Sequence, residues 1–133
     1  MMNLGQLYLI LQPLHYWVSR IGLIAAAIMA AISIYIGIVR KRDVNPWFLR
    51  TVYTITALII FQALVGALMY FIIGVRPYQE VHLIYGLASF LALPFFIFVE
   101  RTAKKRPAMG SYIWGFVILA LILVRSILTG AAG

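Results

Sequence analysis

The chain has 133 residues, of which 65% are hydrophobic and 11% are charged, and its formal net charge is +8. A water-soluble domain is about a quarter charged and about half apolar, so this composition, with a mean hydropathy of +1.03, excludes an ordinary soluble protein. The sequence contains no cysteine, which excludes disulfides, thiolate metal sites and cysteine nucleophiles.

Four long apolar runs follow one another along the chain, and they predict membrane spans at about 14–39, 48–73, 81–99 and 111–129. Each is close to the ~20 residues that a helix needs to cross ~30 Å of hydrocarbon. None alternates as the strands of a membrane barrel do. The sequence therefore predicts one all-α integral membrane domain over residues 1–133, an up-down bundle of four transmembrane helices.

The segment before the first predicted span, residues 1–14, lacks the basic region and the small-residue cleavage site of a cleavable signal peptide. Its mixed character predicts a short interfacial segment that leads into the first span. Pro13 would then lie in the first turn of that helix, where its missing N–H has no cost.

Basic residues predict the orientation of the bundle. Of the 11 Lys and Arg residues, eight lie in or beside the connections after the first and third runs: Arg40, Lys41, Arg42, Arg50, Arg101, Lys104, Lys105 and Arg106. The positive-inside rule makes these two loops cytoplasmic and places both termini and the loop 74–80 outside. We therefore interpret the charge as a topology signal rather than a nucleic-acid surface, and expect an integral protein of a prokaryotic plasma membrane.

The two histidines of the chain, His15 and His82, lie near the outer ends of the first and third predicted spans. In an up-down bundle these two helices are parallel and can lie diagonally opposite, so the imidazoles can face each other across the interior. Haem iron, with two axial positions, suits that arrangement. The pattern predicts a b-type haem with His15 and His82 as metal ligands.

The depth of the two histidines is an open point in this prediction. At 1.5 Å per residue, His15 lies about 37 Å from Arg40, and His82 about 28 Å from Arg101. Level helix ends would separate the histidines by about 9 Å in depth, unless the first helix extends past the membrane or tilts.

Small and polar residues accompany the histidines at helical spacing. We expect five of them to line the cofactor: Ser19, Gly22, Gln62, Gly66 and Gly86. Small side chains leave room for a flat macrocycle, but in membrane helices they also serve close helix packing, which is the alternative for these positions.

Arg20, Arg76 and Arg125 are the basic residues that topology does not explain. An arginine within the membrane costs at least about 2.5 kcal/mol at the centre and normally faces a partner. The predicted outer side carries one acidic residue, Glu80, so we expect haem propionates as partners of the arginines. Snorkelling to the outer headgroups is the alternative.

A family resemblance rests on Gln62-Ala-Leu-Val-Gly66, the short outer loop after it, and His82 at the start of the third span. From Pro13 to about Val99 the chain resembles one four-helix half of haem A synthase. The resemblance implies a haem-binding bundle with His15 and His82 as the axial pair. The membrane anchors of succinate dehydrogenase are loosely similar as well, at Ser19-Arg20.

The chain departs from the haem A synthase pattern at positions tied to catalysis. Gln12 stands where members of that family carry a glutamate, Tyr16 stands where an arginine is common, and the outer-loop cysteines are absent. Glutamine does not supply the negative charge of a carboxylate. The resemblance thus implies haem binding, while the departures argue against synthase activity.

Three functions follow from these patterns. The first is a membrane haem-binding protein for electron transfer or haem handling, without an enzymatic activity of its own. The second is a cofactor-free structural or assembly subunit of a larger membrane complex, in which the histidines are interfacial caps. The third is a half-size oxidoreductase similar to haem A synthase. Expected partners are the lipid bilayer, a second copy of the chain, or subunits of a respiratory-type complex.

Overall fold

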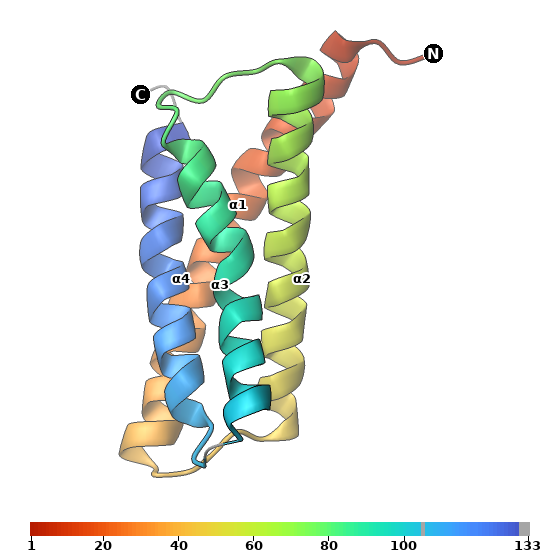
Figure 1. Cartoon of the computed structure of the whole chain (residues 1–133). Coiled ribbons are helices and arrows are strands. Elements are labelled where there is room, and N and C mark those ends of the chain that lie inside the picture. The colour runs from red at the N-terminus through yellow and green to blue at the C-terminus, as the bar shows by residue number, and fades with distance from the viewer. Residues whose placement is uncertain (105, 131–133) are drawn as a thin grey trace.

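The computed structural model describes residues 1–104 and 106–130, and it is helical throughout, without a strand in the described residues (Figure 1). Four helical segments are long and apolar enough to cross a membrane: α1 (Leu4–Ile34) with η1 (Tyr35–Val39), α2 (Pro46–Leu68) with η2 (Met69–Ile73), α3 (His82–Ala103), and α4 (Met109–Gly130). The prediction of an all-α membrane protein with four spans is confirmed.

The four helices run alternately up and down, and each packs against the next along the chain (Figure 1). Helix α1 also packs against α4, which closes the bundle and leaves α1 and α3 diagonally opposite. The main core lies toward the end that carries the loops 40–45 and 104–108, which we call the inner end. There Phe48 of α2 packs edge-on against Tyr112 and Phe116 of α4.

Large apolar side chains cover the outside of the bundle, as expected for contact with lipid. Trp17 is 62% exposed, Phe98 64% and Leu121 64%, on three different helices. In water this much apolar surface would drive aggregation, so the exposure fits an environment of hydrocarbon.

The first helix begins at Leu4, ten residues before the predicted start of the span at 14, so residues 4–13 are the first turns of the same helix. Asn3 caps this helix in a reciprocal capping box with Gln6, and Pro13 lies inside the helix rather than in its first turn. The physical reason is tertiary packing: Leu11 is buried together with Val65 and Met69. That contact holds the first turns of α1 against α2 and η2.

Other helix ends differ from the predicted spans by a few residues. Helix α2 begins at Pro46, because the side chain of Asn45 accepts a hydrogen bond from the Phe48 N–H at 2.8 Å. Segment η2 ends at Ile73, as predicted, because Gly74 follows it with a φ of 86°, a left-handed conformation that favours glycine. Helix α3 continues to Ala103, past the predicted end at 99.

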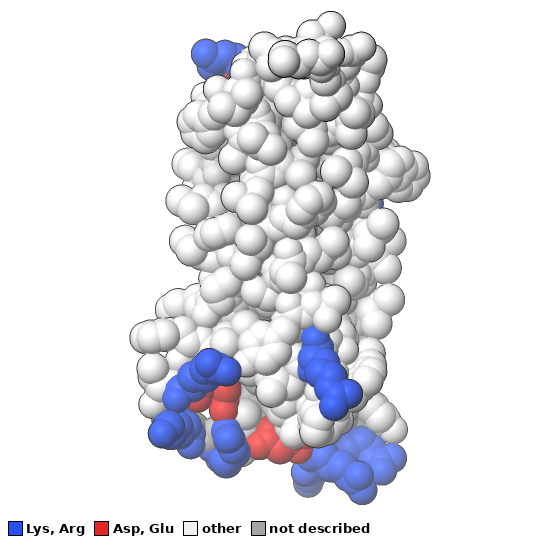
Figure 2. Space-filling view, turned by 90° about the vertical axis from the view of Figure 1, so that its right-hand side faces the viewer, with Lys and Arg blue, Asp and Glu red and all other residues white. Residues whose placement is uncertain are grey.

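On the face shown in Figure 2, most basic and acidic side chains gather at the inner end, and the middle of that face is almost free of them. Seven of the eight basic residues of the predicted cytoplasmic side lie in the described part of the chain; Lys105 lies outside it. The two inner loops are joined by Asp43, whose Oδ1 accepts hydrogen bonds from the N–H of Val44 at 2.8 Å and of Met109 at 2.9 Å. The described basic residues that predicted the orientation therefore lie together at the inner end of the bundle.

Candidate functional site

The structure brings His15 of α1 and His82 of α3 together in the outer half of the bundle. Their ring centroids lie 6.2 Å apart, and the ring planes are at 83° to each other. The rings are therefore at the same level, although the chain lengths to the inner loops differ. Helix α1 achieves this by crossing the bundle obliquely (Figure 1) and by continuing through η1 to Val39.

The hydrogen bonds of His82 determine its tautomer. Nδ1 lies 2.7 Å from the carbonyl oxygen of Ser126, and a carbonyl only accepts, so Nδ1 carries the proton. The hydroxyls of Ser126 and Thr129 lie farther from Nδ1, at 3.4 and 3.5 Å. In the neutral ring Nε2 then holds the free lone pair. A histidine that donates its Nδ1–H to a backbone carbonyl is the usual state of a metal ligand.

Gln62 of α2 connects to the other histidine through the backbone. Its Nε2 donates to the carbonyl oxygen of His15 at 2.7 Å, and its side chain is buried, at 6% exposure. Two polar atoms in this region, His15 Nδ1 and Gln62 Oε1, are buried without a hydrogen-bond partner among the described residues. Buried polar atoms normally have partners, so this pair marks a place where a polar group is missing.

Glycines allow both rings to lie directly against helix backbone. A Cβ at Gly66 would stand 2.9 Å from His15 Cε1, and a Cβ at Gly130 would stand 2.5 Å from His82 Cε1. The other two predicted glycines have different surroundings. A Cβ at Gly22 would meet Ile59 at 2.9 Å, which is helix packing, and at Gly86 it would meet nothing within 4 Å.

The three arginines of the predicted site differ in their partners. Arg76 forms an ion pair with Glu80 at 2.9 Å, and both side chains are exposed. Arg20 lies over the ring of Tyr16, 3.5 Å from its centroid, and donates to the carbonyl oxygen of Tyr16 and to Ser19 Oγ, both at 3.1 Å.

Arg125 of α4 lies 5.7 Å from the ring centroid of Tyr85 on α3. Among the described residues, no carboxylate lies within ion-pair distance of Arg20 or Arg125. The contacts of Arg20 are thus the ring and carbonyl oxygen of Tyr16 and the hydroxyl of Ser19, and Arg125 lies near the ring of Tyr85.

Sequence reasoning named Arg125 on the fourth helix but missed the residues of that helix that contact His82. Ser126, Thr129 and Gly130 surround His82, and their signal is a group of small and polar residues at the end of an otherwise apolar run. Tyr16 and Tyr85, the aromatic partners of the arginines, were missed as well. The contact of Tyr16 with Arg20 could have been predicted, because the two residues are four apart on one helix. The pairing of Tyr85 with Arg125 joins two helices and requires the tertiary structure.

The residues present fit haem better than a bare metal ion. No group of three or more His, Cys, Asp or Glu side chains comes together in the described residues, so an ion that needs a full set of protein ligands lacks them. A haem held on both faces would need two ligands from the protein, and His15 and His82 could supply them. Metal–imidazole bonds of about 2 Å on both sides of one ion place the ring centroids about 6 Å apart, close to the separation found here.

Comparisons with family models, with curated proteins and with solved structures find no match to this chain.

Proposed function

We propose that the protein is a membrane electron carrier that binds haem b between His15 and His82. The observation that carries the proposal is the meeting of the two imidazoles at 6.2 Å across the bundle, with Nδ1 of His82 tied to the Ser126 carbonyl. That bond directs the free lone pair to Nε2 and makes the ring a better donor to iron. The buried, unpartnered Nδ1 of His15 supports a missing group at the same place.

The chain's own residues have separate parts in this proposal. Haem, when bound, supplies one-electron redox chemistry at its iron. Gly66 and Gly130 allow the two imidazoles to lie close to the helix backbone, and Gln62 holds the backbone at His15. Arg20 and Arg125 are proposed partners of the propionates, because their charges have no carboxylate in the described chain.

An electron carrier agrees better with these features than a synthase does. The resemblance to half of haem A synthase supports haem as the cofactor and a histidine pair as its ligands. Gln12, however, is exposed on the outer surface of α1, and it is neutral. An iron with two imidazole ligands has no open position for oxygen. We propose that electrons pass to and from membrane partners, such as a second copy or a respiratory-type complex.

The test is the absorption spectrum of the purified protein, oxidised and then reduced, after expression with ample haem. We expect a low-spin haem, and His15→Ala and His82→Ala should each open a coordination position or lose the haem. Tyr78→Ala, an exposed change near the outer ends of the helices, is the matched control and should leave the spectrum unchanged. A colourless wild-type protein would instead favour a structural subunit, and two unaffected histidine variants would reject the axial pair.

A further inference from the structure

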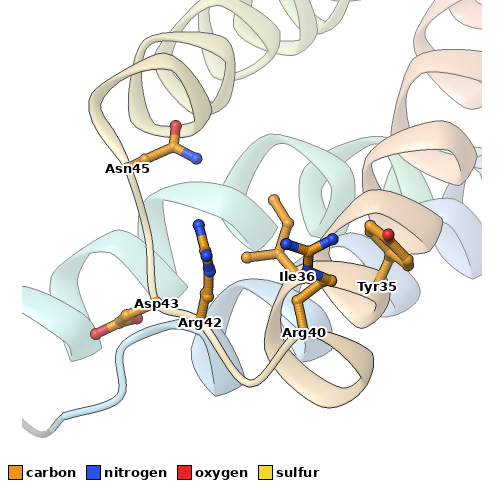
Figure 3. Close-up of a pocket in the computed structure, with 6 residues that line it drawn as sticks. All are labelled: Tyr35, Ile36, Arg40, Arg42, Asp43 and Asn45. Carbon is orange, nitrogen blue, oxygen red and sulfur yellow. The ribbon is translucent and has the colours of Figure 1, made fainter.

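A cleft of about 590 Å³ lies at the inner end, between the start of α2, the end of α3 and the start of α4. The side chains that matter for its chemistry are Leu49, Tyr53, Glu100, Arg101, Lys104 and Arg106. A smaller hollow of about 290 Å³ adjoins it, with Asp43 and Asn45 in both linings. Arg40 and Arg42 extend into this hollow, and the Asp43 carboxylate points away from them (Figure 3).

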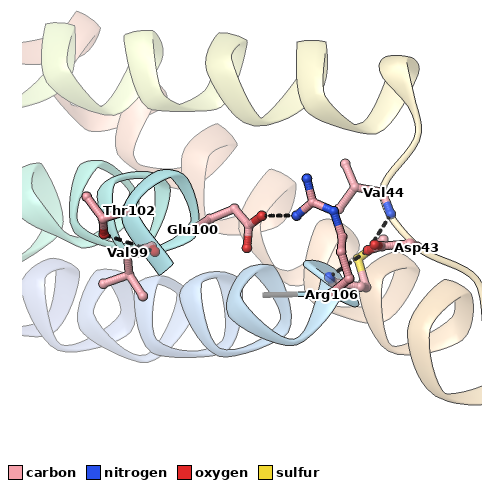
Figure 4. A network of polar contacts seen from close by, with 7 residues as sticks. Asp43, Val44, Val99, Glu100, Thr102 and Arg106 are labelled. Atoms are coloured by element: carbon pink, nitrogen blue, oxygen red, sulfur yellow. Dashed lines mark hydrogen bonds and ion pairs between the residues drawn. The ribbon is translucent and has the colours of Figure 1, made fainter. Parts of the chain in front are cut away.

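The two carboxylates of the cleft already have partners (Figure 4). Glu100 forms an ion pair with Arg106. Asp43 accepts hydrogen bonds from the N–H groups of Val44 and Met109. Both carboxylates of the cleft therefore have partners within the chain, and two of its cations have no carboxylate within ion-pair distance among the described residues.

Arg101 and Lys104 are these remaining cations. Both are exposed, and neither has a carboxylate within ion-pair distance in the described part of the chain. Arg101 donates to the hydroxyl oxygen of Tyr53 at 3.2 Å. A tyrosine hydroxyl that accepts in this way keeps its own proton to donate. Two cations and one hydroxyl donor thus stand together beside the open cleft.

The cleft opens where the apolar helices end. Trp47 in the first turn of α2 is 55% exposed, and Phe98, one turn before Arg101 on α3, is 64% exposed. Exposed aromatic residues beside basic residues at the ends of membrane helices are typical of the headgroup level of a bilayer. Leu49, which packs against the main core, gives the cleft an apolar wall.

We propose that this cleft binds the phosphodiester headgroup of an acidic phospholipid. Arg101 and Lys104 contact the phosphate oxygens, Tyr53 donates its hydroxyl hydrogen to one of them, and Leu49 lies against the glycerol and the first acyl carbons. Basic pockets between membrane helices bind such headgroups, because the phosphate stays at the surface while its chains remain in hydrocarbon. This site is independent of the histidine pair at the opposite end.

The experiment is native mass spectrometry of the full chain released from detergent with phosphatidylglycerol or phosphatidylcholine of the same acyl chains. We expect one tightly held phosphatidylglycerol and much weaker retention of phosphatidylcholine, whose choline cation offsets the phosphate charge and is repelled by Arg101 and Lys104. Each Lys or Arg beside an anionic surface contributes a factor of about five, so Arg101→Gln with Lys104→Gln should weaken binding about 25-fold. Tyr53→Phe, which removes only the hydroxyl, should weaken it several-fold.

The matched control is Lys41→Gln with Arg50→Gln, which removes the same charge from the same end but outside the cleft lining. This control variant should bind phosphatidylglycerol within about twofold of wild type, because its two substituted residues do not line the cleft. That result would show that the lipid is bound by the cleft residues and not by the total charge of the inner end. An equal loss in control and cleft variants overturns the proposal, as does equal retention of both lipids. Displacement of the lipid by inorganic phosphate at millimolar concentration would show a site for a soluble anion and would also overturn it.

Discussion

At the scale of single residues, the two imidazoles depend on glycines for their positions. Gly66 and Gly130 place helix backbone directly against His15 and His82. A side chain at either position occupies the space of an imidazole, and protein interiors have little room to adjust. Glycine at positions 66 and 130 is thus required by the positions of the two imidazole rings.

We expect Gly130→Ala and Gly66→Ala each to displace a histidine ring and to lower the fraction of protein that retains haem. The added Cβ would lie 2.5 Å from His82 Cε1 in the first variant and 2.9 Å from His15 Cε1 in the second. Gly86→Ala is the matched control, because its Cβ meets nothing within 4 Å. The measurement is the ratio of haem absorbance to protein after purification. Equal ratios in all three variants would contradict the packing argument.

Gln12 separates an electron carrier from a synthase. Oxidation of a haem methyl group would need an oxidant such as oxygen, and a route through a cationic intermediate would need nearby negative charge, which one carboxylate supplies strongly in a low-dielectric site. Gln12 is neutral and exposed. We expect Gln12→Ala to leave the haem spectrum unchanged, and wild-type protein to return unmodified haem.

The measurement for this prediction is the mass of the haem extracted after aerobic expression with haem O supplied. Hydroxylated or formyl haem from the wild type, missing from Gln12→Ala, would establish the synthase function and reject the carrier.

At the scale of helices and loops, Asp43 joins the two inner connections. Its carboxylate belongs to the loop before α2 but accepts the N–H of Met109, the first residue of α4. Burial raises the pKa of Asp43, but hydrogen bonds from the backbone of Ala108, Val44 and Met109 outweigh it, and the net pKa lies below the ordinary 3.8. The ionised form therefore stabilises the folded protein.

We expect Asp43→Ala to lower the stability of the protein by about 1 kcal/mol at pH 7, the usual cost of losing a helix cap. Because the folded-state pKa is lowered, this stabilisation is complete above the unfolded pKa and is lost as the pH falls through the folded pKa. The difference between wild type and Asp43→Ala should therefore shrink below about pH 4. Thermal unfolding in mild detergent, followed by circular dichroism at several pH values, measures it.

Asp43→Asn is the control for charge, since asparagine keeps an oxygen that accepts from the same N–H groups. Its loss at pH 7 should be smaller than that of alanine, and its stability relative to Asp43→Ala should not change with pH. A constant gap between wild type and Asp43→Ala down to pH 3 would contradict the role given to the carboxylate.

At the scale of the whole molecule, the charge bias predicts how the bundle sits in the membrane. The inner loops carry the basic residues, and translocating them across the bilayer is unfavourable. The chain has no cysteine, so a single introduced thiol reports on one position alone.

We expect Tyr78→Cys, at a site 62% exposed in the outer loop, to react in intact cells with a thiol reagent that does not cross membranes. Asn45→Cys, in the inner loop, should react only after the cells are permeabilised. The reverse pattern would show that the bundle is inverted, and would place the histidine pair near the cytoplasmic face.

The sequence by itself determined the class of protein, the number of helices and the end that carries the charge. These three properties depend on composition and on the length of each apolar run, which can be read directly from the sequence. About 20 apolar residues span a bilayer whatever side chains they pack against. The parallel direction of the first and third helices also predicted that His15 and His82 face each other across the bundle, but it left their relative depth open. The start of α1 at Leu4 was missed, because the contact of Leu11 with Val65 and Met69 is not local.

The tertiary structure alone decided the depth of the histidines and the surroundings of each glycine and arginine. Helix tilt and rotation are set by packing against neighbouring helices, and no periodicity in one helix reports them. The oblique course of α1 makes the rings level, and the rotation of α4 turns Ser126 and Gly130 toward His82. A helix's apolar pattern shows that it spans the membrane; the direction in which a given side chain faces depends on the other three helices.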